Sequence, residues 1–173
     1  AMVLFQRDLR EADGGDIPYN MVGLSVRGTY AFDSRYLMEV NMGYNGTEQF
    51  APSKRFGFFP AFSLGWVISN EAFMANLREN GIISKLKLRA SVGKVGNDGL
   101  GGTRFLYLDN ISYHVDVNHI ISLGNGGKIS EKMLGNKNIH WETAWKQNYA
   151  IDLTLLKDLD LTFDYFIENR TDI

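Results

Sequence analysis

The chain has 173 residues, of which 45% are hydrophobic and 22% charged, which is enough for one ordinary domain with a core. Its formal net charge of −2 provides no basic field and argues against a nucleic-acid partner. The absence of cysteine excludes disulfides, thiolate metal sites and a cysteine nucleophile.

The printed sequence shows neither a transmembrane helix nor a signal peptide. No uninterrupted apolar run approaches the roughly 20 residues of a transmembrane helix. The first stretch, Ala1 to Asp16, is too rich in charge to be a signal peptide. If the protein is exported, we expect its signal to lie upstream of residue 1.

The strongest signal along the chain is an alternation of apolar and polar residues with period 2. In the first example, Val22, Leu24 and Val26 share one face, and Ser25 and Arg27 share the other. Such alternation predicts strands with one apolar face. The length of each predicted strand is close to the roughly 9–11 residues that a tilted strand needs to cross a bilayer. The predicted strands are 22–32, 36–45, 58–68, 86–93, 145–155 and 161–170, and the shorter piece 2–7 is interpreted as the end of an earlier strand.

The connectors between these strands come in two lengths. Those at 33–35 and 157–160 are short, 46–55 is of medium length, and 95–140 is long and rich in Gly, Asn and Ser. Short turns that alternate with longer loops are typical of outer-membrane barrels, with the long loops outside the cell.

One connector on the short side departs from this scheme. Within 70–84, Phe73, Met74 and Leu77 have helical spacing, and Gly81 follows as a stop signal. The segment could form one or two helical turns, but the sequence alone does not decide whether 70–84 is helical.

Aromatic residues lie near the predicted strand ends, where the girdles of a membrane barrel form. They are Tyr30, Phe32, Tyr36, Tyr44, Trp66, Trp145 and Tyr165. The opposite faces mix small residues with charged and amide side chains, namely Arg27, Glu39, Asn41, Lys87, Arg89, Lys146, Asp152 and Asp164. These faces suit a wet barrel lumen, but they equally suit the solvent-exposed face of a soluble sheet.

Several longer segments carry a resemblance to a known family. They are Arg35–Gly46, Lys54–Trp66, Leu86–Asn97, Trp141–Asn148, Asp164–Phe166 and Arg170–Asp172, of which the stretches 55–66 and 93–97 are the most specific. In this order and spacing they resemble the C-terminal half of the barrel in SusC/RagA-type TonB-dependent transporters. The similarity runs from about Ile17 to Ile173.

The resemblance implies an all-β fold of antiparallel transmembrane strands in a 22-stranded barrel, plugged by an N-terminal domain. It also implies a multi-pass protein of the bacterial outer membrane, surrounded by lipid, that imports glycans or peptides. Its partners would be TonB, acting through the N-terminal part, and a SusD-like surface lipoprotein. The plug, the TonB box and a barrel-closing strand are absent from this sequence. With about six strands, residues 1–173 are therefore expected to be part of a barrel domain.

The search for reaction chemistry points away from an enzyme. The histidines, His114, His119 and His140, have no usable metal-ligand spacing, and no cofactor motif is present. Asp152 and Asp164 can face each other, but Lys146, Arg89 and Arg170 are expected to balance them in a lumen wall. We expect any ligand contacts in the long loop, where exposed rings and polar groups can hold a sugar: Phe105, Tyr107, Asp109, Asn110 and Tyr113.

Two further functions remain open on the residues alone. The first is a soluble β-sandwich module that binds carbohydrate, which the alternation also fits. The second is an outer-membrane barrel enzyme, for which the predicted wall offers no Ser/His constellation.

Overall fold

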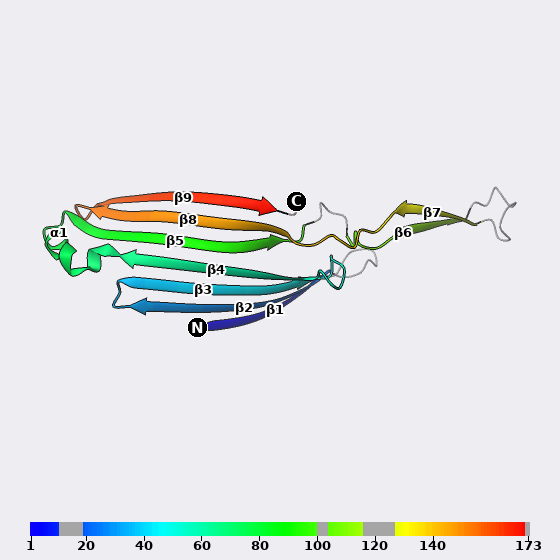
Figure 1. The fold of residues 1–173 in the computed structure, drawn as a ribbon, viewed down its shortest axis with the longest axis horizontal. Coiled ribbons are helices and arrows are strands. Elements are labelled where there is room, and N and C mark those ends of the chain that lie inside the picture. Colours follow the sequence, from blue (N-terminus) through cyan, green and yellow to red (C-terminus); the bar gives the residue numbers. More distant parts are fainter. Residues whose placement is uncertain (11–18, 100–103, 116–126, 172–173) are drawn as a thin grey trace.

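The computed structural model describes residues 1–10, 19–99, 104–115 and 127–171. Seven strands form one antiparallel sheet in the order β1-β2-β3-β4-β5-β8-β9, and a two-stranded hairpin, β6-β7, extends beyond its loop end (Figure 1). The antiparallel all-β fold expected from the alternation is confirmed. The strands are β1 (Met2–Arg10), β2 (Tyr19–Phe32), β3 (Tyr36–Thr47), β4 (Phe56–Val67), β5 (Ile83–Asn97), β6 (Asn110–Val115), β7 (Gly127–Met133), β8 (Glu142–Leu155) and β9 (Leu159–Thr171).

Two strand predictions differ from the structure. The piece 2–7 is a full strand, β1, paired with β2 from Met2 to Arg10. The sheet therefore has seven strands rather than six. The predicted loop 95–140 also contains the hairpin β6-β7 within its described part. Its strands are short, so their alternation is too brief to stand out from a Gly-rich loop.

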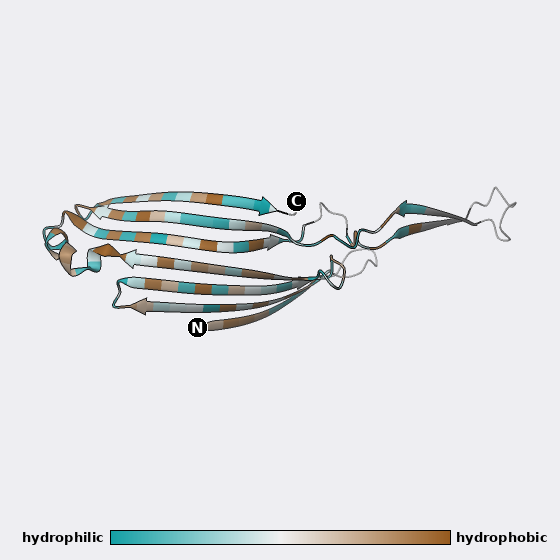
Figure 2. Ribbon diagram, in the orientation of Figure 1, coloured by the Kyte–Doolittle hydropathy of each residue, from teal (hydrophilic) through white to brown (hydrophobic). Residues whose placement is uncertain are grey.

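The register of the sheet separates an apolar face from a polar face. Met38 faces Leu64, and Leu64 faces Ala90, so these apolar positions share one face, which we call the outward face. Its side chains are open to the surroundings: Leu64 is 50% exposed and Phe163 69%. Apolar and polar colours accordingly alternate along the strands (Figure 2). Such a large exposed apolar surface requires an apolar medium, because water would make it an aggregation site.

A small aromatic core lies at the loop end of the sheet. Phe50 is fully buried and Trp141 is 5% exposed, with ring centroids 5.6 Å apart. The Phe59 ring also packs edge to face against Trp141, with centroids 5.1 Å apart, and the Trp141 indole donates a 2.9 Å hydrogen bond from Nε1 to the Arg55 carbonyl. This core ties the loop after β3 to the start of β8.

The connector between β4 and β5 is helical, which answers the question that the sequence leaves open for 70–84. It consists of the 3-10 helices η1 (Ile68–Asn70) and η2 (Ala72–Met74), followed by α1 (Ala75–Glu79). Gly81 ends it with a φ of +70°, a conformation that glycine adopts without steric cost. Among the described residues, no helix is long and apolar enough to cross a membrane.

Glu71 anchors this connector to the outward face. Its carboxylate accepts hydrogen bonds from Trp66 Nε1 at 3.0 Å, the Tyr36 hydroxyl at 2.8 Å and Arg35 Nη1 at 3.1 Å. The Tyr36 and Trp66 rings lie nearly parallel, with centroids 6.4 Å apart. The hydrogen bonds from Trp66 and Tyr36, and then the contact with Arg35, lower the pKa of Glu71. The connector is thus held by an ionised carboxylate at the aromatic girdle.

Acidification is expected to loosen this connector. Because the folded-state pKa of Glu71 is depressed, its stabilisation is present above the unfolded value of about 4.3 and is lost as the pH falls through the folded pKa. Glu71→Gln keeps an acceptor for Trp66 but removes the charge, so the variant is expected to be less stable near neutrality and to lose less on acidification. Thermal unfolding of the full-length protein at a series of pH values measures this. Parallel pH profiles for the variant and the wild type contradict it.

Candidate transport surface

The polar face of the sheet, called here the inward face, carries all eight charged and amide residues that the alternation groups together. Arg27 faces Asn41, Lys87 faces Asp152, and Ala150 joins Arg89 to Asp164 in one cross-strand row. The eight are Arg27, Glu39, Asn41, Lys87, Arg89, Lys146, Asp152 and Asp164. One face of six neighbouring strands is therefore wet while the other is apolar.

One ion cluster on the inward face lies on β2 and β3. Arg27 Nη2 is 2.6 Å from Glu39 Oε2, and Asn41 Nδ2 donates to Glu39 Oε1 at 2.8 Å. The carboxylate of Glu39 is thereby held from both sides.

A second cluster joins β5, β8 and β9. Arg89 binds Asp152 through two 2.9 Å hydrogen bonds, from Nε and Nη2, and its Nη2 is 3.7 Å from Asp164 Oδ1. The fork of a guanidinium suits this two-point contact. Because the Arg89 side chain is 39% exposed, the pairs contribute at most about 1 kcal/mol each and chiefly fix side-chain positions.

The negative charges of Asp152 and Asp164 share one ion-pair partner, Arg89, where the sequence suggested three cations. Arg89 contacts both carboxylates, whereas Lys146 and Arg170 pair elsewhere. Lys146 Nζ lies 3.5 Å from Glu168, and Arg170 lies 2.5 Å from Glu168 and 3.8 Å from Glu142. The expectation that Lys146 and Arg170 balance the two aspartates was therefore wrong. It failed because cross-strand register, rather than charge type, selects the partners.

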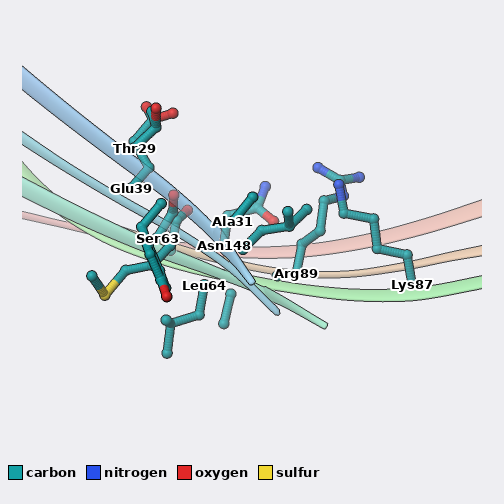
Figure 3. A pocket seen from close by; sticks show the side chains of 14 residues that line it. Thr29, Ala31, Glu39, Ser63, Leu64, Lys87, Arg89 and Asn148 are labelled. Carbon is teal, nitrogen blue, oxygen red and sulfur yellow. The ribbon is translucent and has the colours of Figure 1, made fainter. Parts of the chain in front are cut away.

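Between the two clusters the inward face is hollowed. A hollow of 470 Å³ lies between Glu39 on one side and Lys87 and Arg89 on the other. Lys87 and Arg89 project from the same side of the strands, whereas Leu64 points to the other side (Figure 3). The small and polar side chains between the clusters are Thr29, Ala31, Ser63, Ser91 and Asn148, with Gly65 beside them. Hydroxyl and amide groups here can exchange hydrogen bonds with a passing polar solute, and no described group pairs a nucleophile with a base.

The residues predicted as loop contacts are only partly brought together. Phe105 and Tyr107 meet edge to face with centroids 6.4 Å apart. Asp109 instead accepts a 2.8 Å hydrogen bond from the backbone of Gly135, Asn110 begins β6, and Tyr113 lies within β6 opposite Ile129. Within this set the structure describes a side-chain contact between the two rings, and a ligand site formed by the five residues stays a prediction.

Two arginines beside these rings were missed by the sequence reading. The Arg104 guanidinium lies 4.8 Å from the centre of the Phe105 ring and 3.1 Å from Glu48. Arg55 donates to the Tyr107 hydroxyl at 3.5 Å. Neither belongs to an alternating segment, so periodicity gave no signal for them. Of the histidines, His140 Nδ1 lies 2.8 Å from the Asn138 carbonyl oxygen, His114 lies in β6, and His119 falls outside the described residues.

Comparisons with known proteins give consistent relatives, although no family model matches the chain. TonB-dependent receptor P39 of Formosa agariphila is 35% identical over 151 residues, covering 87% of this chain and 14% of that protein. TonB-dependent receptor SusC of Bacteroides thetaiotaomicron is 30% identical over 151 residues, covering 86% and 14%. The chain thus spans about a seventh of the length of these relatives.

Solved structures show the same fold. The RagAB peptide importer in its closed-closed state matches with a TM-score of 0.77 at 18% identity, over 91% of this chain and 16% of that one. Its open-open state matches with a TM-score of 0.73 at 16% identity, over 92% and 17%. By sequence and by fold, the chain belongs to the SusC/RagA-type TonB-dependent receptors, which are β-barrel proteins of the bacterial outer membrane.

Proposed function

We propose that residues 1–173 form part of the barrel domain of a larger outer-membrane importer, energised through TonB, that takes up glycans or other oligomeric nutrients. The observation that carries the proposal is the division of one set of strands into an apolar outward face and a polar inward face. A soluble sandwich module, the alternative on sequence grounds, would need to cover the outward face. In a barrel, lipid covers it.

The inward face fits a passage better than a tight binding site. The carboxylates of its main ion clusters are paired within the wall, Glu39 with Arg27 and Asp152 and Asp164 with Arg89, so a neutral polar solute can pass without displacing a strong charge partner. The hydroxyl and amide groups of the hollow suit sugars, which are rich in hydroxyls. Glycan import with a SusD-like lipoprotein as lid is therefore the favoured form, and oligopeptide import is the competing outcome.

The import proposal is tested on the complete protein in its native host. A deletion strain complemented with the full gene is given labelled oligosaccharides and oligopeptides, with and without a functional TonB. Glycan uptake that requires both the gene and TonB supports the proposal. TonB-dependent uptake of peptides alone overturns the glycan form, and no gene-dependent uptake of either class overturns the import function. Co-purification of a surface lipoprotein tests the partner.

The paired rings of the loop give a local prediction. If Phe105 and Tyr107 stack on a sugar, Tyr107→Ala loses about 0.5–1.5 kcal/mol, which is about a two- to twelvefold weaker affinity. Tyr107→Phe keeps the ring and is expected to retain most of the affinity. Leu108→Ala, next along the same loop, serves as the matched control. Calorimetry with the full-length protein measures the effect, and equal losses for Tyr107→Ala and Leu108→Ala rule out stacking.

A further inference from the structure

One charge lies on the outward face. On strands β2, β3, β4, β5, β8 and β9, the described outward positions include a single charged side chain, Lys94. It faces Trp145 across the β5–β8 ladder. A lysine on the lipid-facing side of a barrel costs about 2–4 kcal/mol at mid-membrane and little near the headgroups. The position of Lys94 along β5 therefore decides what it contacts.

The apolar residues of the outward face form a band across the strands. Lys94 lies at the edge of this band, on the side of the long loops. On β3 and β4 the band reaches Tyr44, which faces Phe58. On β5 it ends after Val92, just before Lys94, and on β8 Gln147, which faces Val92, interrupts it before Trp145, the partner of Lys94. The last apolar position thus shifts toward the short-turn end from β4 to β5, as expected for strands tilted by about 35–45°. Lys94 lies at this edge, at headgroup level in the leaflet next to the long loops.

The strands separate beside this lysine. The β4–β5 ladder ends at Ala61 and Gly93, although β4 extends back to Phe56 and β5 continues to Asn97. Pro60, which has no N–H to donate, is the next residue of β4 beyond the last pair. A groove of 510 Å³ opens where the ladder ends, and both Lys94 and Lys54 line it. Neither lysine forms an ion pair with any residue that the structure describes.

We propose that this groove binds the phosphate of an anionic lipid in the outer leaflet, with the ammonium groups of Lys54 and Lys94 as its ligands. Trp145 and Phe58, which also line the groove, contact the apolar part of the same lipid. Two ammonium groups on a membrane-facing groove match a phosphate in charge, and the groove is continuous with the lipid-covered face. The inference depends on the membrane placement of the sheet and is independent of what the importer transports.

The test uses the full-length protein in mild detergent and native mass spectrometry. The probes are diphosphoryl lipid A, its dephosphorylated form, and inorganic phosphate. Lys54→Gln/Lys94→Gln is expected to lower lipid A retention about tenfold, whereas Lys54→Arg/Lys94→Arg retains it. The matched control is Lys132→Gln/Lys137→Gln, which removes two exposed charges from the same end of the molecule but away from the groove. Circular dichroism checks that each variant keeps its sheet.

Each of three results overturns the proposal. Unchanged retention in Lys54→Gln/Lys94→Gln means that the groove is not the site. Equal binding of the dephosphorylated lipid means that the phosphate is not recognised. Displacement of lipid A by an equal concentration of inorganic phosphate means that the site takes a free anion rather than a lipid.

Discussion

Replacing Leu64 by arginine is expected to destabilise the barrel strongly, whereas the same replacement at the adjacent Ser63 is expected to be tolerated. The two residues are neighbours on β4 with opposite orientations: Leu64 faces outward between Met38 and Ala90, and Ser63 faces inward between Glu39 and Ser91. On the lipid face an arginine costs about 2–4 kcal/mol at the membrane midplane and less toward the interfaces, and Leu64 lies one outward position from Trp66, so a loss near the lower end of that range is expected. At Ser63 it enters the 470 Å³ hollow beside the Glu39 carboxylate, where water and an acidic partner are available.

Comparing the two variants tests which face of the sheet meets the membrane. Both place an arginine on β4 at nearly the same depth, so they differ mainly in the face on which it lies. The amount of full-length protein in isolated outer membranes, and the temperature at which its folded band is lost on unheated gels, measure the effect. Leu64→Arg is expected to lower both clearly below Ser63→Arg. Equal behaviour of the two variants, or a worse result for Ser63→Arg, contradicts the orientation of the sheet.

Strand positions and orientations could be predicted from the sequence because period 2 is itself the geometry of a strand. The segment 36–45 predicts β3, observed as Tyr36–Thr47, and the polar face containing Glu39 and Asn41 follows from alternation alone. The helical connector was only suggested by the sequence, because Phe73, Met74 and Leu77 have helical spacing over less than two turns, too few to decide between a helix and a loop.

Features that depend on contacts between distant segments could not be predicted in this way. Arg89 selects Asp152, 63 residues away, because the β5–β8 register places their side chains within reach. The sequence contains the charges but not the register. Lys94 lies just beyond the predicted strand 86–93, and its pairing with Trp145 places it on the outward face. Likewise, Trp141 gave no periodic signal, although it centres the aromatic core at the loop end.

Trp141→Ala is expected to open that loop end while leaving the middle of the sheet intact. The indole is almost fully buried between Phe50 and Phe59, and large-to-alanine changes at such sites cost about 3–5 kcal/mol. The neighbouring backbone and side chains cannot move far enough to fill the cavity that the substitution leaves. A Cβ added at Gly96 would already lie 2.2 Å from the Phe59 ring and 3.0 Å from Trp141, so β5 packs directly against these rings. The loss therefore concentrates where β4 and β5 have ceased to pair.

Hydrogen exchange of the full-length protein, with brief trypsin digestion, tests this expectation. The segment 46–55 is expected to exchange faster in Trp141→Ala, and cleavage after Lys54 and Arg55 to rise, because the Arg55 carbonyl loses its hydrogen bond from the Trp141 indole. Trp141→Phe retains a ring but loses that bond and part of the buried volume, so it is expected to cost more than the roughly 1 kcal/mol of the bond alone and less than Trp141→Ala. Trp145→Ala, on the outward face of β8, the strand that follows Trp141, controls for loss of a tryptophan. If it exposes 46–55 as much as Trp141→Ala does, the buried aromatic core is not what holds the loop to the barrel wall.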